Sequence, residues 1–314
     1  MTSGGGSGAV SVLIPAYKPG ARLAAVLESL AKQTCPDVLV QVSVDPDAEG
    51  PPPEVVGPPN LRLEVIHPIR RLGWVANANS LLAQVRTPFF ILLGHDDHLT
   101  PTYIEAARDV LGRRPEVVTA HGSTRHHGLR DDILWTRSIE GVRLQRVLTF
   151  LERRPHAAGL GFRGVVRSTA LKGGMRLRLR RSNGMFSNDL MALEMLLHGE
   201  SAHIDGIYYD KFLYADGLSR DFHGRPVEER SAMFGDNIAC LADMVTEAGF
   251  SAPEKELIVA RYAEWLLTLD GQWNVLADAP SSDATPFAEI RPAVAHFVAM
   301  ALLSAATPKD AAKE

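Results

Sequence analysis

Apolar residues follow two alternating periods along the first 111 residues, and these periods predict strands and helices in turn. Short continuous apolar runs rich in β-branched residues predict buried strands, whereas apolar residues spaced three or four apart predict amphipathic helices. The predicted strands cover residues 10–14, 38–45, 61–66 and 88–94, and the predicted helices cover residues 21–32, 74–85 and 103–111. This alternation indicates a parallel sheet with helices on both faces.

The pattern is looser beyond residue 111. Strands are predicted at 117–122 and within 159–168, whereas the Arg- and His-rich stretch from Ser123 to Arg137 is typical of a loop. A helix is predicted from Asp189 to its capping glycine, Gly199. After Pro226 the apolar residues keep a helical spacing over three segments separated by prolines.

These patterns predict three parts in the chain. Residues 1–9 are rich in Gly and Ser and are expected to form a flexible tail. Residues 10–225 are expected to form an α/β domain with two halves, 10–110 and 111–225. Residues 226–314 are expected to form a C-terminal helical region.

Composition and charge narrow the classes of function. The net charge is −4 and the basic residues are spread along the chain, so we expect no nucleic-acid partner. The apolar stretch at 293–306 is shorter than the roughly 20 residues that span a bilayer, so we expect no membrane span. Cys35 and Cys240 have no metal or redox spacing, which fits a cytoplasmic protein.

Two adjacent carboxylates, Asp96 and Asp97, follow the apolar strand at 88–94. Parallel sheets bind ligands at the carboxyl ends of their strands, where Asp45 also lies. Adjacent carboxylates repel each other unless donors or a divalent cation neutralise them, and oxygen ligands favour Mg²⁺ or Mn²⁺ together with substrate phosphates. A solvated turn, with Asp97 as a helix cap, is the alternative interpretation.

Two rival chemistries fit less well. His95 and His98 flank the acidic pair, as ligands of a metal hydrolase could, but neighbours on an extended chain point to opposite faces. A dinucleotide enzyme is disfavoured because "PAYKPG", and no G-x-G-x-x-G, follows the first strand.

Three stretches then carry a resemblance to a known family: "VSVLIPAYKPGARLAAVLESLAKQ", "VSVDPDAEG" and "LGWVANANSLLAQVRTPFFILLGHDDHLTP". In order and spacing they resemble the nucleotide-sugar-binding half of the inverting family-2 glycosyltransferases, over residues 10–110 and in outline to residue 220. The resemblance implies a GT-A-type, Rossmann-like mixed sheet flanked by helices, with a C-terminal helical extension. It also implies transfer of a sugar from a UDP- or dTDP-sugar to a hydroxyl or amine, with the acceptor half at 111–225.

The resemblance implies roles for single residues at the donor side. Pro15, Ala16 and Tyr17 would wrap the nucleotide base, and Asp45 would accept a hydrogen bond from that base. Asn79 matches an asparagine in the helix before the acidic motif. A turn residue at Asp45 and an ordinary polar residue at Asn79 are the alternatives.

The acidic pair resembles the family's D-x-D-type motif. Asp96 would face the ribose or sugar, and Asp97 would hold the Mn²⁺ or Mg²⁺ that bridges the diphosphate. Two positions depart from the family pattern, because Gly94 and Pro46 stand where many members carry further aspartates. The strength of metal dependence is therefore open.

Inverting transfer needs one general base, which a single carboxylate can supply. The family's base lies at a helix start after a "GGF"-like turn, and Gly173, Gly174 and Met175 resemble that turn. Asp189 would then be the base, with Asn188 in place of the usual glutamate. Helix capping is the alternative role for Asp189, and both roles can coexist.

Several expectations concern the rest of the molecule. The Arg-rich segment 176–181 is expected to be an exposed loop, and the spacing of Trp265 and Trp273 favours the core. The acceptor is expected to be a small molecule or a glycan, and the C-terminal helices are expected to form a homodimer. A sugar-phosphate nucleotidyltransferase and a non-catalytic nucleotide- or glycan-binding relative remain alternatives to the transferase.

Overall fold

The computed structural model of the chain describes residues 8–47, 53–153, 163–179, 187–214 and 225–267, together with Ala295, Val298 and Ala299. Its strands are β1 (Val10–Tyr17), β2 (Val38–Asp45), β3 (Arg62–Ile66), β4 (Phe89–Leu92), β5 (His98–Leu99), β6 (Val117–Gly128), β7 (Ile133–Leu134), β8 (Val165–Arg167) and β9 (Glu200–Leu213). Its helices are α1 (Gly20–Ala31), α2 (Trp74–Leu82), α3 (Tyr103–Arg113), α4 (Arg143–Glu152), α6 (Thr169–Lys172), α7 (Ser187–His198), α9 (Val227–Glu247) and α10 (Ala252–Leu267). Each element predicted over the first 111 residues is present.

The named strands of the described residues form one mixed sheet in the order β3–β2–β1–β4–β8–β6–β9–β5, with β7 paired to β6. Strands β3, β2, β1 and β4 run parallel. Strand β8 is antiparallel to both β4 and β6, and β9 is parallel to β6. The carboxyl ends of β1, β2, β4, β6 and β9 therefore point to the same edge, where sheets of this kind bind ligands.

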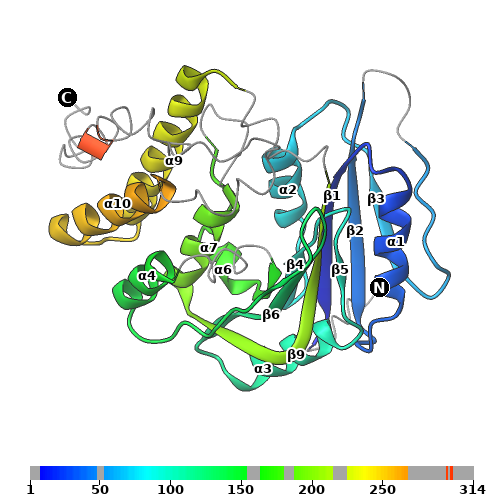
Figure 1. Cartoon of the computed structure of the whole chain (residues 1–314). Coiled ribbons are helices and arrows are strands. Elements are labelled where there is room, and N and C mark those ends of the chain that lie inside the picture. Colours follow the sequence, from blue (N-terminus) through cyan, green and yellow to red (C-terminus); the bar gives the residue numbers. More distant parts are fainter. Residues whose placement is uncertain are drawn as a thin grey trace, which may run out of the picture.

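Helices cover both faces of the parallel half of the sheet (Figure 1). Side chains along a strand alternate between the two faces. In β1, Val12 and Ile14 therefore belong to the apolar core shared with α1 and α3, whereas Leu13 belongs to the core shared with α2. Burial on both faces explains the continuous apolar runs from which these strands were predicted.

A second helical layer packs beside the sheet. Helices α4, α7, α9 and α10 share one apolar core, which includes Phe150, Phe234 and Tyr262, and Figure 1 shows them together on the side away from α1. Helices α9 and α10 match the first two segments predicted after Pro226, while the third, around residues 287–297, lies outside the described residues apart from Ala295. Within the described part of the chain, no helix is long and apolar enough to cross a membrane.

Strand β6 extends further than the sequence pattern predicts. The expectation of a loop from Ser123 to Arg137 is wrong for its first part, because β6 continues to Gly128 and then pairs with β7. Polar side chains of this part are paired across the sheet: Arg125 Nε lies 2.6 Å from Oδ1 of Asp210 on β9. The spacing of apolar residues does not predict this part of the strand, because its polar side chains pair with ionic partners that are distant in sequence and do not pack on an apolar face.

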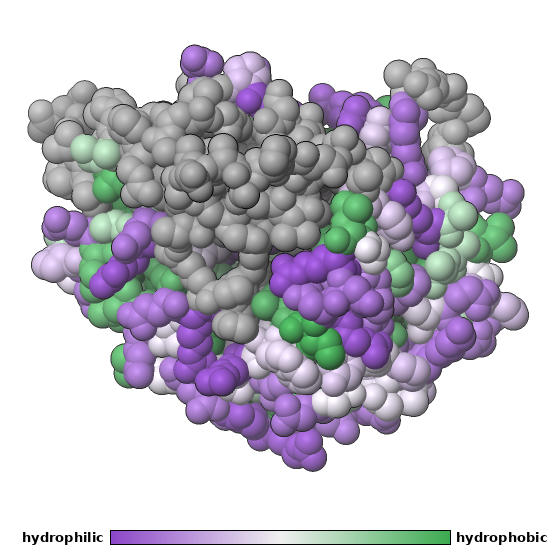
Figure 2. Space-filling view, in the orientation of Figure 1, coloured by the Kyte–Doolittle hydropathy of each residue, from purple (hydrophilic) through white to green (hydrophobic). Residues whose placement is uncertain are grey.

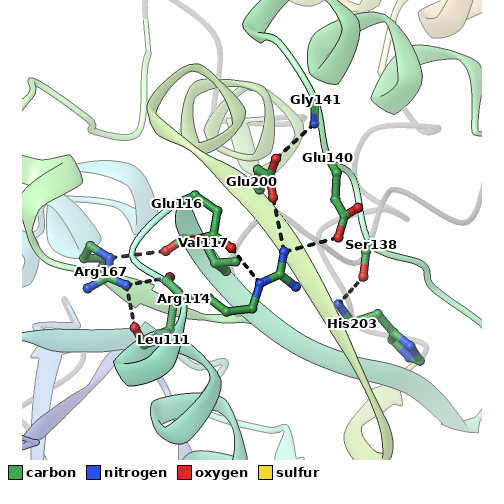
Figure 3. A network of polar contacts seen from close by, with 10 residues as sticks. All are labelled: Leu111, Arg114, Glu116, Val117, Ser138, Glu140, Gly141, Arg167, Glu200 and His203. Carbon is green, nitrogen blue, oxygen red and sulfur yellow. Dashed lines mark hydrogen bonds and ion pairs between the residues drawn. The ribbon is translucent and has the colours of Figure 1, made fainter.

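A polar network holds the opposite edge of the sheet together (Figure 3). Arg114 lies 2.7 Å from Glu116, 3.3 Å from Glu140 and 3.2 Å from Glu200. The guanidinium of Arg167 donates to backbone carbonyls at the end of α3 and at the start of β6. Because the last carbonyls of a helix lack partners within the helix, these bonds satisfy the end of α3. The network thus fixes the starts of β6 and β9.

The described surface is mainly polar. On the face shown in Figure 2, described residues are mostly hydrophilic or intermediate, and hydrophobic residues form separate patches. Large apolar side chains that are exposed come from several segments: Val56, Ile69, Leu129, Ile133, Trp135, Val142, Leu179 and Leu257. Among these described residues, α9 and α10 contribute Leu257 alone, so the homodimer through the C-terminal helices stays a prediction.

Candidate functional site

The sheet topology brings the predicted donor-side residues to one edge. Tyr17 and Asp45 are paired at the ends of β1 and β2. Asp96 and Asp97 follow β4, which pairs with the other side of β1. The end of β9 reaches the same place, because the backbone N–H of Phe212 donates to Oδ1 of Asp97 at 3.1 Å. The edge thus combines residues that are more than 100 positions apart.

Asp45 holds the turn that leads into α2. Its side chain is buried, and its Oδ1 and Oδ2 accept hydrogen bonds from the backbone N–H groups of Leu72 at 3.1 Å and Gly73 at 2.8 Å. Gly73 has a φ of 76°, which favours glycine, so the turn depends on both residues. A carboxylate has further lone pairs, and the predicted bond from a nucleotide base to Asp45 stays a prediction.

Tyr17 lies in a cluster of charged side chains that the sequence did not single out. The guanidinium carbon of Arg71 lies 4.1 Å from the centre of the Tyr17 ring, within the range of a cation–π contact. The Tyr17 hydroxyl lies 3.4 Å from Oδ1 of Asp47, whose Oδ2 lies 2.7 Å from Lys18 Nζ. The basic pair before α2 and the second aspartate of "DPDAEG" were the signals available in the sequence.

Pro15 and Ala16 differ from Tyr17 in what they present to this edge. Ala16 is 1% exposed and packs into the apolar core, while Pro15 is half-buried. Of the three residues predicted to wrap a base, Tyr17 is therefore the one with an aromatic ring among the charged groups of the edge.

Asn79 clamps the chain that follows α6. Its Nδ2 donates to the carbonyl of Leu177 at 2.9 Å, and its Oδ1 accepts from the N–H of Leu177 at 3.0 Å. Both ends of the amide are thus used in joining α2 to a segment 98 residues away. The geometry gives Asn79 this positioning role, and a direct contact with the donor stays a prediction.

In its described part, 176–179, the Arg-rich segment is not the fully exposed loop that the sequence suggests. Met175 and Leu177 are buried, so the described part of the segment alternates between core and solvent. The side chain of Arg178 is 9% exposed and lies 2.7 Å from the buried Glu194 and 2.8 Å from Glu247 on α9. A buried carboxylate requires such a partner, which explains why this arginine is drawn inward.

Asp97 is fully buried and already has three neutralising partners. Its carboxylate accepts a hydrogen bond from the Tyr209 hydroxyl at 2.7 Å and from the Phe212 N–H at 3.1 Å. Lys211 Nζ lies 3.1 Å from each carboxylate oxygen. The repulsion between adjacent carboxylates is thus relieved by an ammonium of the protein itself. A cation on Asp97, as the resemblance implies, would have to displace Lys211.

Asp96 is the carboxylate of the pair that faces outward. It is half-buried, and no hydrogen bond to it is formed by the described residues. Arg22 stacks on the Tyr214 ring at 3.7 Å, and both Asp96 and Arg22 act electrostatically on Tyr214 and on His95. Burial lowers the pKa of His95, against the opposing effect of Asp96. Asp96 therefore lies among groups that can contact a polar ligand.

Gly94 lies too close to Asp97 to carry a side chain. A Cβ built at this position would lie 2.5 Å from Oδ2 of Asp97 and 3.1 Å from Oδ1 of Asp96. The carboxylate that many family members carry here would therefore collide with Asp97 in its present position.

The side chains at this edge offer few ligands to a divalent cation. In the part of the chain that the structure describes, no three His, Cys, Asp or Glu side chains group as metal ligands do. Asp97 is taken by Lys211, Gly94 offers no ligand, and Asp96 alone remains. A Mg²⁺ or Mn²⁺ site with phosphates usually has one or two carboxylates. Asp96 is therefore the one carboxylate of the acidic pair left for such an ion, and the described residues do not form a complete cation site on their own.

Three histidines of β6 contact other side chains, and the described residues form no hydrolase centre around them. His121 Nε2 lies 2.9 Å from Ser201 Oγ, and His126 Nδ1 lies 2.8 Å from Asp132. His127 Nε2 lies 3.0 Å from Asp210. His223 and Trp273 lie outside the described residues, whereas Trp265 is buried in the core as predicted.

Asp189 is a buried carboxylate in the first turn of α7. It is 6% exposed, and burial raises its pKa from about 3.8 to about 8. The Arg163 guanidinium acts in the opposite direction. An acid whose pKa lies near neutral pH is suited to proton transfer, because it exchanges protons readily at that pH.

Two further groups belong to the surroundings of Asp189. Arg163 also lies 5.6 Å from the ring centre of Tyr209, the residue that donates to Asp97. The Arg163 guanidinium therefore acts electrostatically on Tyr209 as well as on Asp189. Tyr262 on α10 is fully buried, and its hydroxyl has no hydrogen-bond partner among the described residues. Burial, and to a smaller extent Asp189, raises the pKa of Tyr262. The C-terminal helices thus contribute to this environment.

Comparison with protein families decides the class of the chain. The model described as "Glycosyl transferase family 2" matches residues 11–172, which is more than half of the chain. The chain belongs to glycosyl transferase family 2. It is a glycosyltransferase, and the resemblance stated from the motifs is confirmed. No curated protein matches this glycosyltransferase significantly.

Solved structures show the same fold. S. aureus TarS 1–349 in complex with UDP-GlcNAc has a TM-score of 0.63 at 17% identity, covering 95% of this chain and 89% of that chain. The TarS 1–349 structure has a TM-score of 0.62 at 14% identity, covering 95% and 83%. A mannosyltransferase from Pyrobaculum calidifontis in complex with GDP-Man and Mn²⁺ has a TM-score of 0.47 at 13% identity, covering 96% and 88%. At such identities the likeness to the two TarS structures shows the fold alone, and the GT-A-type mixed sheet is confirmed.

Proposed function

We propose that this glycosyltransferase moves a sugar from a nucleotide-diphospho-sugar to a hydroxyl or amine of a small-molecule or glycan acceptor, with inversion and with Asp189 as general base. A UDP- or dTDP-sugar is the favoured donor. The observation that carries the proposal is the buried Asp189 carboxylate, whose pKa is raised to about 8 in a chain of this family.

The general base follows from the chemistry of direct displacement. An acceptor hydroxyl attacks the sugar carbon from the side opposite the leaving diphosphate, and one group removes its proton as the new bond forms. A carboxylate with an ordinary pKa is a weak base, whereas burial strengthens Asp189. Its place in the first turn of α7 acts against burial and favours the ionised form, because the helix dipole stabilises negative charge there.

The donor side follows from the carboxyl edge of the sheet. Tyr17 and Arg71 offer a ring and a guanidinium to a nucleotide, while Asp45 holds the adjacent turn. Asp96 faces outward between this cluster and the end of β9, in position for a ribose or sugar hydroxyl. Carboxylates accept hydrogen bonds from such hydroxyls, which supports Asp96 as a donor-binding residue.

A Mn²⁺ or Mg²⁺ ion is expected from the family resemblance, and such an ion would neutralise the leaving diphosphate as a Lewis acid. The described residues fit it poorly, because Asp97 is paired with Lys211 and Asp96 stands alone. We therefore derive no catalytic step through a metal. The proposed cytoplasmic location and the homodimer stay predictions.

A donor panel tests the proposal. Purified protein is mixed with UDP-, dTDP- and GDP-sugars, and release of the nucleoside diphosphate is followed for the wild type, for Asp189→Asn and for Asp205→Asn. Asp205 is a matched control because its side chain is 98% exposed. Release by the wild type and the control, with none by Asp189→Asn despite retained nucleotide binding, is the expected result.

The same panel distinguishes the alternatives. A nucleotidyltransferase would instead form a nucleoside triphosphate and a sugar phosphate when pyrophosphate is added. A non-catalytic relative would bind a sugar nucleotide in calorimetry without releasing its diphosphate. Full activity of Asp189→Asn would contradict the assignment of the base.

A further inference from the structure

Lys211 occupies an unusual position for a lysine in this site. It lies on β9, next to the strand end that meets the β4–β5 loop, and its side chain is 23% exposed. Its Nζ lies 3.1 Å from both oxygens of Asp97, which is 0% exposed. The ammonium is therefore held by a buried carboxylate, on a side chain that is partly exposed at the edge where the donor is expected.

The other contacts of Asp97 stabilise its ion pair with Lys211. Tyr209 and the Phe212 N–H hold the same carboxylate, so each oxygen has at least two donors. Removing a buried, hydrogen-bonded carboxylate from such partners costs more than breaking an exposed pair. A divalent ion would have to expel the Lys211 ammonium against this cost.

The absence of a side chain at Gly94 fits the position in which Lys211 holds the Asp97 carboxylate. The pairing holds Asp97 where a Cβ at residue 94 would lie 2.5 Å from its carboxylate. The chain therefore lacks the neighbouring carboxylate and has a fixed positive charge beside the one that remains buried. One change removes a metal ligand, and the other supplies charge of the kind that the metal would bring.

An ammonium has three N–H donors, and Asp97 accepts two of them at most. We propose that Lys211 takes the place of the divalent cation, with its remaining donor and its charge directed at the donor diphosphate, so that this glycosyltransferase binds its nucleotide without metal. The inference rests on the proposed function for the identity of the ligand. Lysine binds phosphate as a compact point charge, which suits this role.

Calorimetry with and without chelator tests the inference. UDP, dTDP and GDP are titrated into the wild type in excess EDTA and again in Mn²⁺. For the nucleotide that binds most tightly, the two dissociation constants of the wild type should differ by less than about tenfold, or 1.4 kcal/mol. A wild-type loss of tenfold or more in EDTA overturns the inference.

Lys211→Met removes the charge and keeps most of the side-chain length. In EDTA this variant should bind the nucleotide at least about tenfold more weakly than the wild type, and Mn²⁺ should restore binding, because the freed Asp97 can then accept a cation. Lys211→Arg keeps the charge and should bind in EDTA. Binding by Lys211→Met that equals the wild type in EDTA also overturns the inference.

A neighbouring ion pair provides the matched control. Arg125→Gln breaks the contact between β6 and Asp210 on β9, the strand that carries Lys211, and should leave binding in EDTA unchanged. Circular dichroism checks the fold of each variant, while the wild-type comparison requires no variant. Metal-dependent binding with sugar transfer would overturn the role of Lys211 and leave the proposed function standing. Absence of binding under both conditions would overturn both.

Discussion

The pH dependence of turnover follows from the burial of Asp189. Burial raises its pKa to about 8, so at pH 7 about a tenth of the molecules carry the ionised base, and at pH 9 about nine tenths do. If proton removal by Asp189 limits the rate, kcat should rise about tenfold between pH 7 and pH 9. An ordinary aspartate would be fully ionised at both pH values and would give a flat profile.

The same shift affects stability with a defined sign. The pKa of Asp189 in the folded protein lies above the value of about 3.8 in the unfolded chain, so the folded state binds the proton more tightly. The contribution is fully present below about pH 4 and is lost as the pH rises through about 8. Four pKa units correspond to about 5 kcal/mol of unfolding free energy, and Asp189→Asn should remove this dependence.

Initial rates at saturating donor, measured every half unit from pH 6 to pH 9.5, test the first expectation. Asp205→Asn should reproduce the wild-type profile, because Asp205 is exposed and lies away from the base. Urea unfolding of wild type and Asp189→Asn at pH 5 and pH 8 tests the second. A kcat that levels off above pH 5 would show that Asp189 has an ordinary pKa or is not the base.

Three further substitutions test the packing around the site. Gly94→Ala should lower the unfolding free energy in urea by about 1–3 kcal/mol, because the new Cβ would clash with the acidic pair. The control is Gly112→Ala, whose Cβ would meet nothing within 4 Å and which should be neutral or stabilising. Equal effects of the two substitutions would contradict this geometry. Arg178→Met should lower the unfolding free energy by about 3–5 kcal/mol, because it leaves the buried Glu194 carboxylate without its ionic partner. Arg261→Met breaks an exposed pair and should lower it by about 1 kcal/mol or less. Similar losses would argue against burial of the Arg178 pair. Asn79→Ala should cost about 1–3 kcal/mol by orphaning two backbone groups, and an unchanged denaturation midpoint would refute the clamp.

Local pattern was sufficient for the parallel half of the sheet. Its strands and helices are specified by apolar spacing within 4 to 12 residues, and each face is buried against a helix that follows in sequence. The edge that collects Asp45, Asp96 and Asp97 follows directly from that order, since parallel strands present their carboxyl ends together.

The partners of those residues could not be predicted in the same way. Lys211 is 114 positions from Asp97, and Leu177 is 98 positions from Asn79. No spacing rule links residues so far apart in the chain. Lys211 and Asp97, for example, meet because β9 lies beside β6 and reaches the β4–β5 loop. The sequence therefore predicted a metal ion on Asp97, whereas the fold places the Lys211 ammonium there.

The burial of Arg178 was missed for a related reason. Its segment is rich in arginine, which is typical of solvated loops, and its acidic partners lie on α7 and α9. Alternation of Met175 and Leu177 with arginines was the available signal, because a period of two indicates one buried face.

The central claim is that this chain transfers sugar from a nucleotide-diphospho-sugar with Asp189 as the base. The most direct measurement is the release of UDP, dTDP or GDP from the matching sugar nucleotide at pH 8, by wild type and by Asp189→Asn. The account predicts release by the wild type and loss of turnover in the variant, with nucleotide binding retained. Equal release by both proteins would contradict it.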